Sequence, residues 1–406
     1  MLLRNLFSKW WPLATLILLF GISVLIRLPS FNIDPVKAAV YTDFGQWTDT
    51  EVWLHDKYVL DIYDVYPVAV HKFLPYVGTD PQFLANAAAP ELTVYTSFSP
   101  AMFIALYGAL RVFDAPATFM SMQVFSLAIH LVSVLLMYYL CRLLTRDRLI
   151  GVLGATIYLF ATGALWYHMN VYWAHQLLMP VFLTALIVFV RRQGKLKWWE
   201  GLGLGLSMSL IAWTGVVSTV GFLFYGGYKY VTTKQRAYLN YLFMLGGMLL
   251  ALLLIVLQVL MATGASLGDY LSIVAHRAQT RTIAAKTMTF PVMLWRFFTT
   301  MLVDYGGYML IAYTLAMKRR FHGFASGVVF VASFPLLESA ILLEHDTIYG
   351  FGRLKWLIPV VILICLLGAK FATTRKRRVI LVAAVILASI LHVWLYSVAY
   401  WHPHAR

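Results

Sequence analysis

The residues best suited to catalysis lie in an acidic stretch between residues 31 and 91. It holds nine of the seventeen acids of the chain: Asp34, Asp43, Asp49, Glu51, Asp56, Asp61, Asp64, Asp80 and Glu91. A positioned carboxylate can act as a general base, because it accepts the proton of an attacking hydroxyl group. Asp43, in TDFGQW, is the first candidate for this role, although Thr-Asp before Phe-Gly also suits a turn. Asp49 and Glu51, in TDTE, are further candidates, but their spacing equally indicates acids that cap a helix.

A second set of candidates is basic and falls in two later polar segments, 263–297 and 342–356. These candidates are His276, Arg277, Arg281, Arg296, His345 and Arg353. Arg277 and Arg281 are four residues apart, so a helix would place both on one face as a clamp for a phosphate group. The alternative is a basic edge that contacts lipid head groups. His345 could contact a donor phosphate or hydrogen-bond the catalytic carboxylate, or it could be structural.

Some polar residues lie within or beside apolar segments. Asp304 and Glu338 are intramembrane ionisable residues, which makes them functional candidates by default. Each could instead only pair with an arginine or tyrosine inside the bundle. The segment HMNVYWAHQ, residues 168–176, contains His168 and His175 among aromatic residues. This pattern favours an aromatic belt at a membrane interface over a platform for sugar binding.

The elements that must position these residues are membrane-spanning helices. The 406-residue chain is 61% hydrophobic and 12% charged, with a mean hydropathy of +0.76. Soluble domains are about 45–50% apolar and about 25% charged, which excludes a water-soluble globule. We therefore predict one all-α membrane domain over residues 1–406. Its eleven predicted spans are 10–28, 117–140, 149–165, 173–190, 199–213, 216–231, 239–262, 298–317, 322–343, 354–371 and 379–397.

The basic residues between these spans predict the topology. Twenty of the 32 Lys and Arg residues fall in six short clusters near residues 4–9, 142–148, 191–197, 229–236, 318–320 and 370–378. All six share one face if 199–231 forms two helices that turn near residues 213–215, and the positive-inside rule makes that face cytoplasmic. The short apolar segment 99–113 must then be an interfacial or re-entrant helix. The N-terminus is predicted inside, and the loop 29–116 outside.

Several classes of protein are excluded or disfavoured by what the sequence lacks. There is no HExxH, CxxC, Walker loop or dinucleotide-binding glycine motif. The basic residues are divided among short turns, so a nucleic-acid partner is not expected despite the net charge of +15. Cys141 and Cys365 both lie in apolar segments, which argues against a structural disulfide.

Two motifs of the first loop carry a resemblance to a known family. TDFGQW, with Asp43, resembles the Asp-aromatic motif of integral-membrane glycosyltransferases of class C that use polyprenyl-phosphate mannose. YTSFSP, with Tyr95 and Pro100, is similar to the (Tyr/Thr)-x-Pro-Pro segment of the same branch, with one proline instead of two. Gly45 stands where a related mannosyltransferase has a second aspartate, so a metal bound through a DxD pair is not indicated. No cofactor is assigned, and a divalent metal remains an open alternative.

The resemblance implies a GT-C-like enzyme of about eleven transmembrane helices. The enzyme would move a mannose-like hexose or a pentose from a polyprenyl-phosphate sugar donor to a lipid-linked or glycan acceptor. Asp43 would be its general base, and Arg277, Arg281 and His345 would contact the donor phosphate. Membrane lipids are the other expected partners, and a bacterial inner membrane with a periplasmic site is the expected location. The alternatives are a polyprenyl-diphosphate-linked glycan polymerase or ligase, and a lipid or sugar transporter.

Overall fold

The computed structural model describes residues 2–31, 101–115, 119–170, 174–263, 266–281, 289–318, 323–348 and 350–401, and these ranges contain helices and no strand. The elements are α1 (Leu2–Arg27), η1 (Leu28–Ser30), α6 (Ala101–Val112), α7 (Phe119–Thr145), α8 (Arg148–Phe160), α9 (Thr162–Asn170), α10 (Ala174–Arg191), α11 (Trp198–Ile211), α12 (Trp213–Thr233), η3 (Arg236–Asn240), α13 (Tyr241–Thr263), α14 (Leu267–Arg281), α15 (Phe290–Lys318), α16 (Phe324–Ser333), α17 (Leu336–Ile341), α18 (Leu343–Ile348), η4 (Gly350–Trp356), α19 (Leu357–Phe371), α20 (Arg375–Tyr396) and η5 (Ser397–Trp401).

Six helical segments in the described ranges are long and apolar enough to cross a membrane, and there are seven if α8 and α9 count as one broken span. These two helices meet at an angle of 63°. The predicted number of eleven spans is therefore not confirmed, although a helix lies at each of the eleven predicted positions. α6 has 12 residues and a length of about 18 Å, too short for a hydrocarbon core of about 30 Å.

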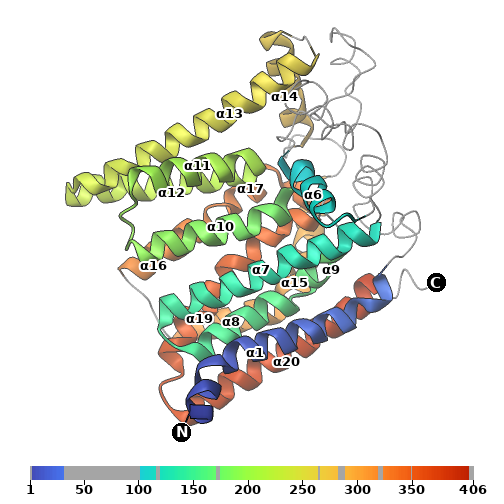
Figure 1. The fold of residues 1–406 in the computed structure, drawn as a ribbon, viewed down its shortest axis with the longest axis vertical. Helices are drawn as coiled ribbons and strands as arrows, with labels where there is room; N and C mark the ends of the chain where they lie inside the picture. The colour runs from blue at the N-terminus through green and yellow to red at the C-terminus, as the bar shows by residue number, and fades with distance from the viewer. Residues whose placement is uncertain are drawn as a thin grey trace.

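The long helices run side by side, and the helix ends that carry the described basic clusters lie at one end of the bundle (Figure 1). Arg319 and Arg320 of the cluster at 318–320 lie outside the described residues. Arg378, at the start of α20, forms an ion pair of 3.1 Å with Asp147, which caps α8. α1 and α20 both run from this basic end to the opposite end, where α6 and α14 also lie (Figure 1). The shared position of the clusters is the arrangement that the charge pattern predicts. We call the opposite end the α14 end.

The predicted turn between two helices in 199–231 is confirmed. α11 ends at Ile211 and α12 begins at Trp213, with Ala212 in an extended conformation between them. α11 then packs closely on α13 through glycines. A Cβ on Gly205 would lie 2.1 Å from the carbonyl oxygen of Met244, so only glycine allows this approach of the two backbones. Small residues at contacts between helices are a common feature of membrane proteins.

The predicted span 322–343 differs from the structure. The helix there is interrupted after Ser333, because Pro335 has no N–H to continue the hydrogen-bond ladder. The chain continues as the short helices α17 and α18 and the turn η4 before it re-enters the bundle as α19. The interruption brings polar residues of 338–356 into the bundle, where they form part of the candidate site.

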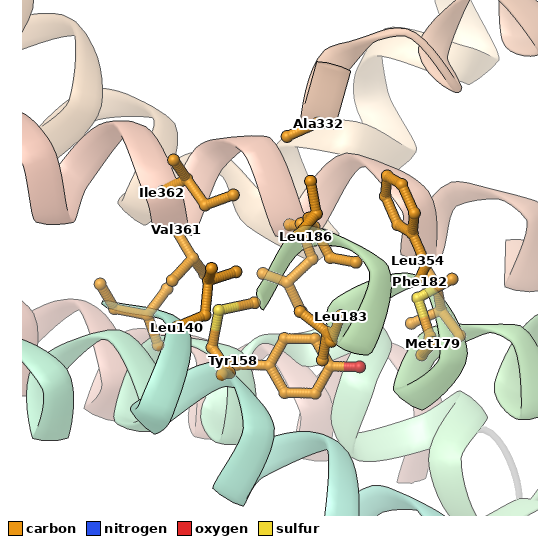
Figure 2. Packing of buried hydrophobic residues seen from close by; sticks show 14 of the residues in the cluster. Leu140, Tyr158, Met179, Phe182, Leu183, Leu186, Ala332, Leu354, Val361 and Ile362 are labelled. Atoms are coloured by element: carbon orange, nitrogen blue, oxygen red, sulfur yellow. The ribbon is translucent and has the colours of Figure 1, made fainter. Parts of the chain in front are cut away.

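The core that holds these helices together lies between α7, α8, α10 and α19. Figure 2 shows Leu140, Tyr158, Leu183, Leu186 and Val361 from these helices in one packed layer, and all five are fully buried. In a bilayer this packing gains little from the hydrophobic effect, because the lipid tails are equally apolar. Close van der Waals contact and buried polar pairs therefore have a larger share in holding the bundle together.

Candidate functional site

The predicted catalytic carboxylates lie outside the described residues. Asp43, Asp49 and Glu51 fall in the range 32–100, and so does Tyr95. The helix that follows, α6, lies at the α14 end of the bundle (Figure 1). The general-base role of these acids remains a prediction.

The predicted phosphate clamp lies on a helix, as its spacing indicates. His276, Arg277 and Arg281 are in the C-terminal half of α14. The helix begins with a reciprocal cap, in which Ser266 donates hydrogen bonds to Asp269 from its backbone N–H at 3.0 Å and from its hydroxyl at 2.7 Å. These bonds hold the pKa of Asp269 below its ordinary value.

An apolar cavity of about 190 Å³ lies where α14 packs against the bundle. Its lining comes from α11, α12, α13 and α14, and includes Trp213, Ile255 and Tyr270. Leu267 and Leu271, on the first turns of α14, are more than half exposed. The site thus combines an apolar pocket with a helix whose C-terminal half carries basic residues. Such a site is complementary to a lipid that has an apolar tail and an anionic head group.

Arg353 lies in a buried ion pair. Its Nε is 3.0 Å from Oδ2 of Asp304, and both side chains are almost completely buried. Its remaining N–H groups donate to the carbonyl oxygen of Asp346 at 2.8 Å and to the hydroxyl of Tyr167 at 3.3 Å. Tyr305 in turn donates to the carbonyl oxygen of Arg353 at 3.1 Å. This guanidinium therefore joins η4, α9, α15 and α18.

Lys355 lies between two buried acids. Its Nζ is 2.9 Å from Oε2 of Glu338 and 2.9 Å from Oδ2 of Asp346. Ser339 donates to Asp346, and Thr214 of α12 donates to Glu338. A buried charge is tolerated when it is paired and hydrogen-bonded, and both acids meet this condition. We call Asp304, Glu338, Asp346, Arg353 and Lys355 the ion-pair cluster.

The ion-pair cluster shows how the two intramembrane acids are paired, while their functional role remains a prediction. Asp304 pairs with an arginine, as one alternative predicted, whereas Glu338 pairs with a lysine and a threonine. Arg296 is exposed on the first turns of α15. His345 lies in α18, the same short helix as Asp346.

A second polar cluster was missed by the sequence analysis. Arg27, the last residue of α1, is fully buried, and its Nη2 donates to Nδ1 of His130 at 3.1 Å. The ring of His130 is stacked on that of His168, with 4.2 Å between the ring centroids. Nε2 of His168 is 3.1 Å from the hydroxyl of Tyr158. These four residues, together with Asn170, are called the Arg27 cluster below.

Asn170 is connected to the same region through Gln123. The amide of Gln123 donates to Oδ1 of Asn170 at 3.0 Å and to the carbonyl oxygen of Ser30 at 2.8 Å. The hydroxyl of Ser30 lies 3.2 Å from that of Tyr396 on α20. These bonds tie the end of α1 to α7, α9 and α20.

A periodic signal could have revealed the Arg27 cluster. Gln123, Ser126, His130 and Ser133 are spaced by three, four and three residues, so they lie on one face of α7, and all four are buried. The predicted aromatic belt was wrong for His168 and His175, because both are buried inside the bundle. Polar residues at helical spacing in an apolar segment indicate an interior polar face rather than an interface.

The described residues contain no group of three or more His, Cys, Asp or Glu side chains arranged to hold a metal ion. Cys141 and Cys365 are free and buried, as expected.

Two solved structures share this fold. The oligosaccharyltransferase of Archaeoglobus fulgidus in its apo form aligns with 96% of this chain at a TM-score of 0.60 and 13% identity. The same protein tethered by a disulfide bond to an acceptor peptide with an NVT sequon aligns with 97% at a TM-score of 0.56 and 13% identity. The chain spans 56% of that protein's length in both. No protein-family model and no curated protein sequence matches the chain.

This likeness confirms the predicted fold class. Over its described residues the chain is an all-helical membrane protein with a fold of the class C glycosyltransferase type. At 13% identity the likeness concerns the fold, and the chemistry must be argued from the residues.

Proposed function

We propose that the protein is a membrane glycosyltransferase that transfers a sugar from a polyprenyl-phosphate donor to a lipid-linked or glycan acceptor. The observation that carries the proposal is the fold shared with an oligosaccharyltransferase over 96% of the chain. It is supported by the acidic segment 31–91, which joins α1 to α6 and holds the two resemblance motifs. The active site belongs to the α14 end, on the extracytoplasmic face.

The proposed reaction is a single displacement at the anomeric carbon. Asp43 takes the proton of the acceptor hydroxyl, and the hydroxyl oxygen forms a bond to that carbon. The bond between the carbon and the phosphate oxygen breaks, and polyprenyl phosphate leaves with the bonding electrons. Arg277 and Arg281 of α14 stabilise the negative charge on the leaving phosphate, with His345 as a further contact.

The apolar cavity beside α14 suits the lipid part of this donor. The cavity is lined by α11, α12, α13 and α14, and the two arginines lie on the same helix that borders it. An isoprenoid chain in the cavity would keep its phosphate near the basic end of α14. The burial of apolar surface would then supply affinity, while the arginines would supply specificity for the anionic head.

A transfer assay tests the proposal. Purified full-length protein is mixed with a labelled polyprenyl-phosphate sugar and a membrane extract as acceptor source, and labelled product is measured. Asp43→Asn is expected to lower kcat at least about 100-fold, because general-base catalysis contributes about that much. Asp56→Asn, in the same segment, is the matched control and should retain activity. Full activity of Asp43→Asn, with Asp49→Asn and Glu51→Gln also active, would contradict the mechanism.

A second candidate concerns the acceptor. One of the aligned structures is bound to an acceptor peptide with an NVT sequon, which favours a peptide acceptor as the alternative to a lipid or glycan. The same assay with a synthetic peptide containing Asn-Val-Thr distinguishes them. Label in the peptide would identify a protein glycosyltransferase, and label only in the lipid fraction would identify a glycolipid-forming enzyme.

A further inference from the structure

Arg27 is a buried cation that has no acid partner among the described residues. Its side chain is fully buried, and its one described hydrogen bond goes to His130, whereas Nε and Nη1 have no hydrogen-bond partner. Burying a charge is unfavourable unless a counter-charge and hydrogen bonds compensate. Arg353 of the same bundle has that compensation from Asp304. The state of Arg27 therefore suggests that its counter-charge comes from a bound group.

The side chains near Arg27 also carry hydrogen-bond donors. A guanidinium can only donate, so Nδ1 of His130, which faces Nη2 of Arg27, must be the acceptor. In a neutral imidazole the proton then resides on Nε2, and His130 can donate it to the backbone of Tyr158. The amide nitrogen of Asn170 is buried and unpartnered, while its oxygen is occupied by Gln123. Two side chains of one cluster, from α1 and α9, thus hold N–H groups without acceptors.

An excess of donors around a positive charge is complementary to an oxyanion. A phosphate group has several acceptor oxygens and a negative charge, and arginine binds it with two parallel N–H groups. Carboxylate-rich sites for cations have the opposite composition. The Arg27 cluster also lies where α1 ends, so that the acidic segment with the proposed general base follows it directly in the chain.

We propose that the Arg27 cluster is a binding site for a phosphate group, and that the group belongs to a polyprenyl phosphate molecule other than the donor bound at α14. Arg27 donates to one phosphate oxygen from an unpartnered guanidinium nitrogen, and the amide nitrogen of Asn170 donates to another. The assignment of this phosphate to a polyprenyl lipid rests on the proposed function, whereas the assignment of a phosphate-binding site to the Arg27 cluster does not. The site is separate from α14, to which the sequence analysis assigned phosphate binding.

Ligand-dependent thermal stability tests this site. The purified protein is kept in detergent and in a buffer without phosphate. It is titrated with undecaprenyl phosphate, undecaprenol, phosphatidylglycerol or inorganic phosphate, and Tm is measured for each. The wild type should be stabilised by undecaprenyl phosphate and not by undecaprenol, because only the phosphate supplies acceptors. A response to phosphatidylglycerol or inorganic phosphate alone would keep the oxyanion site but overturn the polyprenyl source.

Two substitutions separate ligand binding from a structural role. Arg27→Met keeps the length of the side chain but removes the charge, so the apparent Kd for undecaprenyl phosphate should rise at least about tenfold. Its Tm without ligand should not fall, because an uncompensated buried charge is lost. Arg142→Gln, an exposed arginine at the basic end of α7, is the control and should bind like the wild type.

The opposite outcomes would overturn the proposal. A lower Tm of Arg27→Met without ligand, together with an unchanged response to undecaprenyl phosphate, would mean that an acid of this chain holds the guanidinium. If Arg27→Met does not fold, equal stabilisation of the wild type by undecaprenol and undecaprenyl phosphate would overturn it instead. Failure of the proposed function would give a different result. A protein that binds undecaprenyl phosphate but transfers no sugar would contradict the proposed glycosyltransferase activity and still support the phosphate site at the Arg27 cluster.

Discussion

The bundle contains two buried polar clusters of opposite composition. In the ion-pair cluster, three acids and two bases are arranged so that each charge lies about 3 Å from an opposite charge. In the Arg27 cluster, one guanidinium is surrounded by neutral imidazole, amide and phenol groups. The first cluster is satisfied by the chain itself, and the second is not.

The difference indicates two roles. A satisfied network of charges in a nonpolar medium holds its helices in one arrangement, because separating any pair leaves a charge uncompensated. The ion-pair cluster fastens the interrupted region of α17, α18 and η4 to α12 and α15 in this way. A cluster whose hydrogen-bond donors lack acceptors contributes little to the stability of the fold. Such a cluster is better explained by a ligand that supplies the acceptors. Substitutions in the two clusters should therefore have different effects on stability.

The largest loss of stability is expected for Lys355→Met. This change leaves Glu338 and Asp346 buried without their shared cation, and should lower the free energy of unfolding by about 4 kcal/mol. Chemical denaturation in detergent, followed by tryptophan fluorescence, measures the loss. Lys195→Met, at an exposed lysine, should change it by less than about 0.5 kcal/mol. A loss for Lys355→Met as small as that of the control would show that the cluster does not support the fold.

A somewhat smaller loss, about 3 kcal/mol, is expected for Asp304→Asn. Arg353 would lose its charged partner but keep its hydrogen bonds to the carbonyl oxygen of Asp346 and to Tyr167. The same denaturation experiment on Asp304→Leu, Arg353→Met and the double variant tests the pair. The double variant should be more stable than the sum of the two single losses predicts, and strict additivity would argue against coupling between these side chains.

The smallest of these effects is expected for Gln123→Leu beside the Arg27 cluster. The amide of Gln123 donates to Ser30 and Asn170, and loss of neutral hydrogen bonds in a buried site costs about 1–2 kcal/mol. The same chemical denaturation can compare this variant with Gln235→Leu, at an exposed glutamine in the turn before η3. A loss larger than that of Lys355→Met would reverse the order of the two clusters and contradict their assigned roles.

Much of the fold could be predicted from the sequence, because helix positions depend on local hydropathy. The division of 199–231 into two helices also followed from charge, since only that division places all the basic clusters at one end. The single span at 322–343 was wrong for a local reason, the proline at 335. An average of hydropathy over a window does not reveal that a single residue lacks a backbone N–H. Pro335 itself was visible in the sequence.

The candidate site was predicted less completely. The helical spacing of Arg277 and Arg281 is confirmed by α14, while their role in binding phosphate remains a prediction. The role of Arg353 in binding substrate remains a prediction, and the sequence did not reveal that its guanidinium pairs with Asp304, a residue 49 positions away. Such pairing depends on which helices are neighbours, and this information is not contained in the spacing of either residue.

The sequence by itself determined that this chain is a helical membrane protein, that most of its basic residues fall in short clusters between the helices, and that about half of its acids lie in one segment. These properties follow from composition and periodicity, which act over a few turns of a helix. Only the tertiary structure decided which buried charges have partners. The energy of a buried charge depends on atoms within a few ångströms, and at Arg27 and Lys355 the neighbours that matter come from distant parts of the chain.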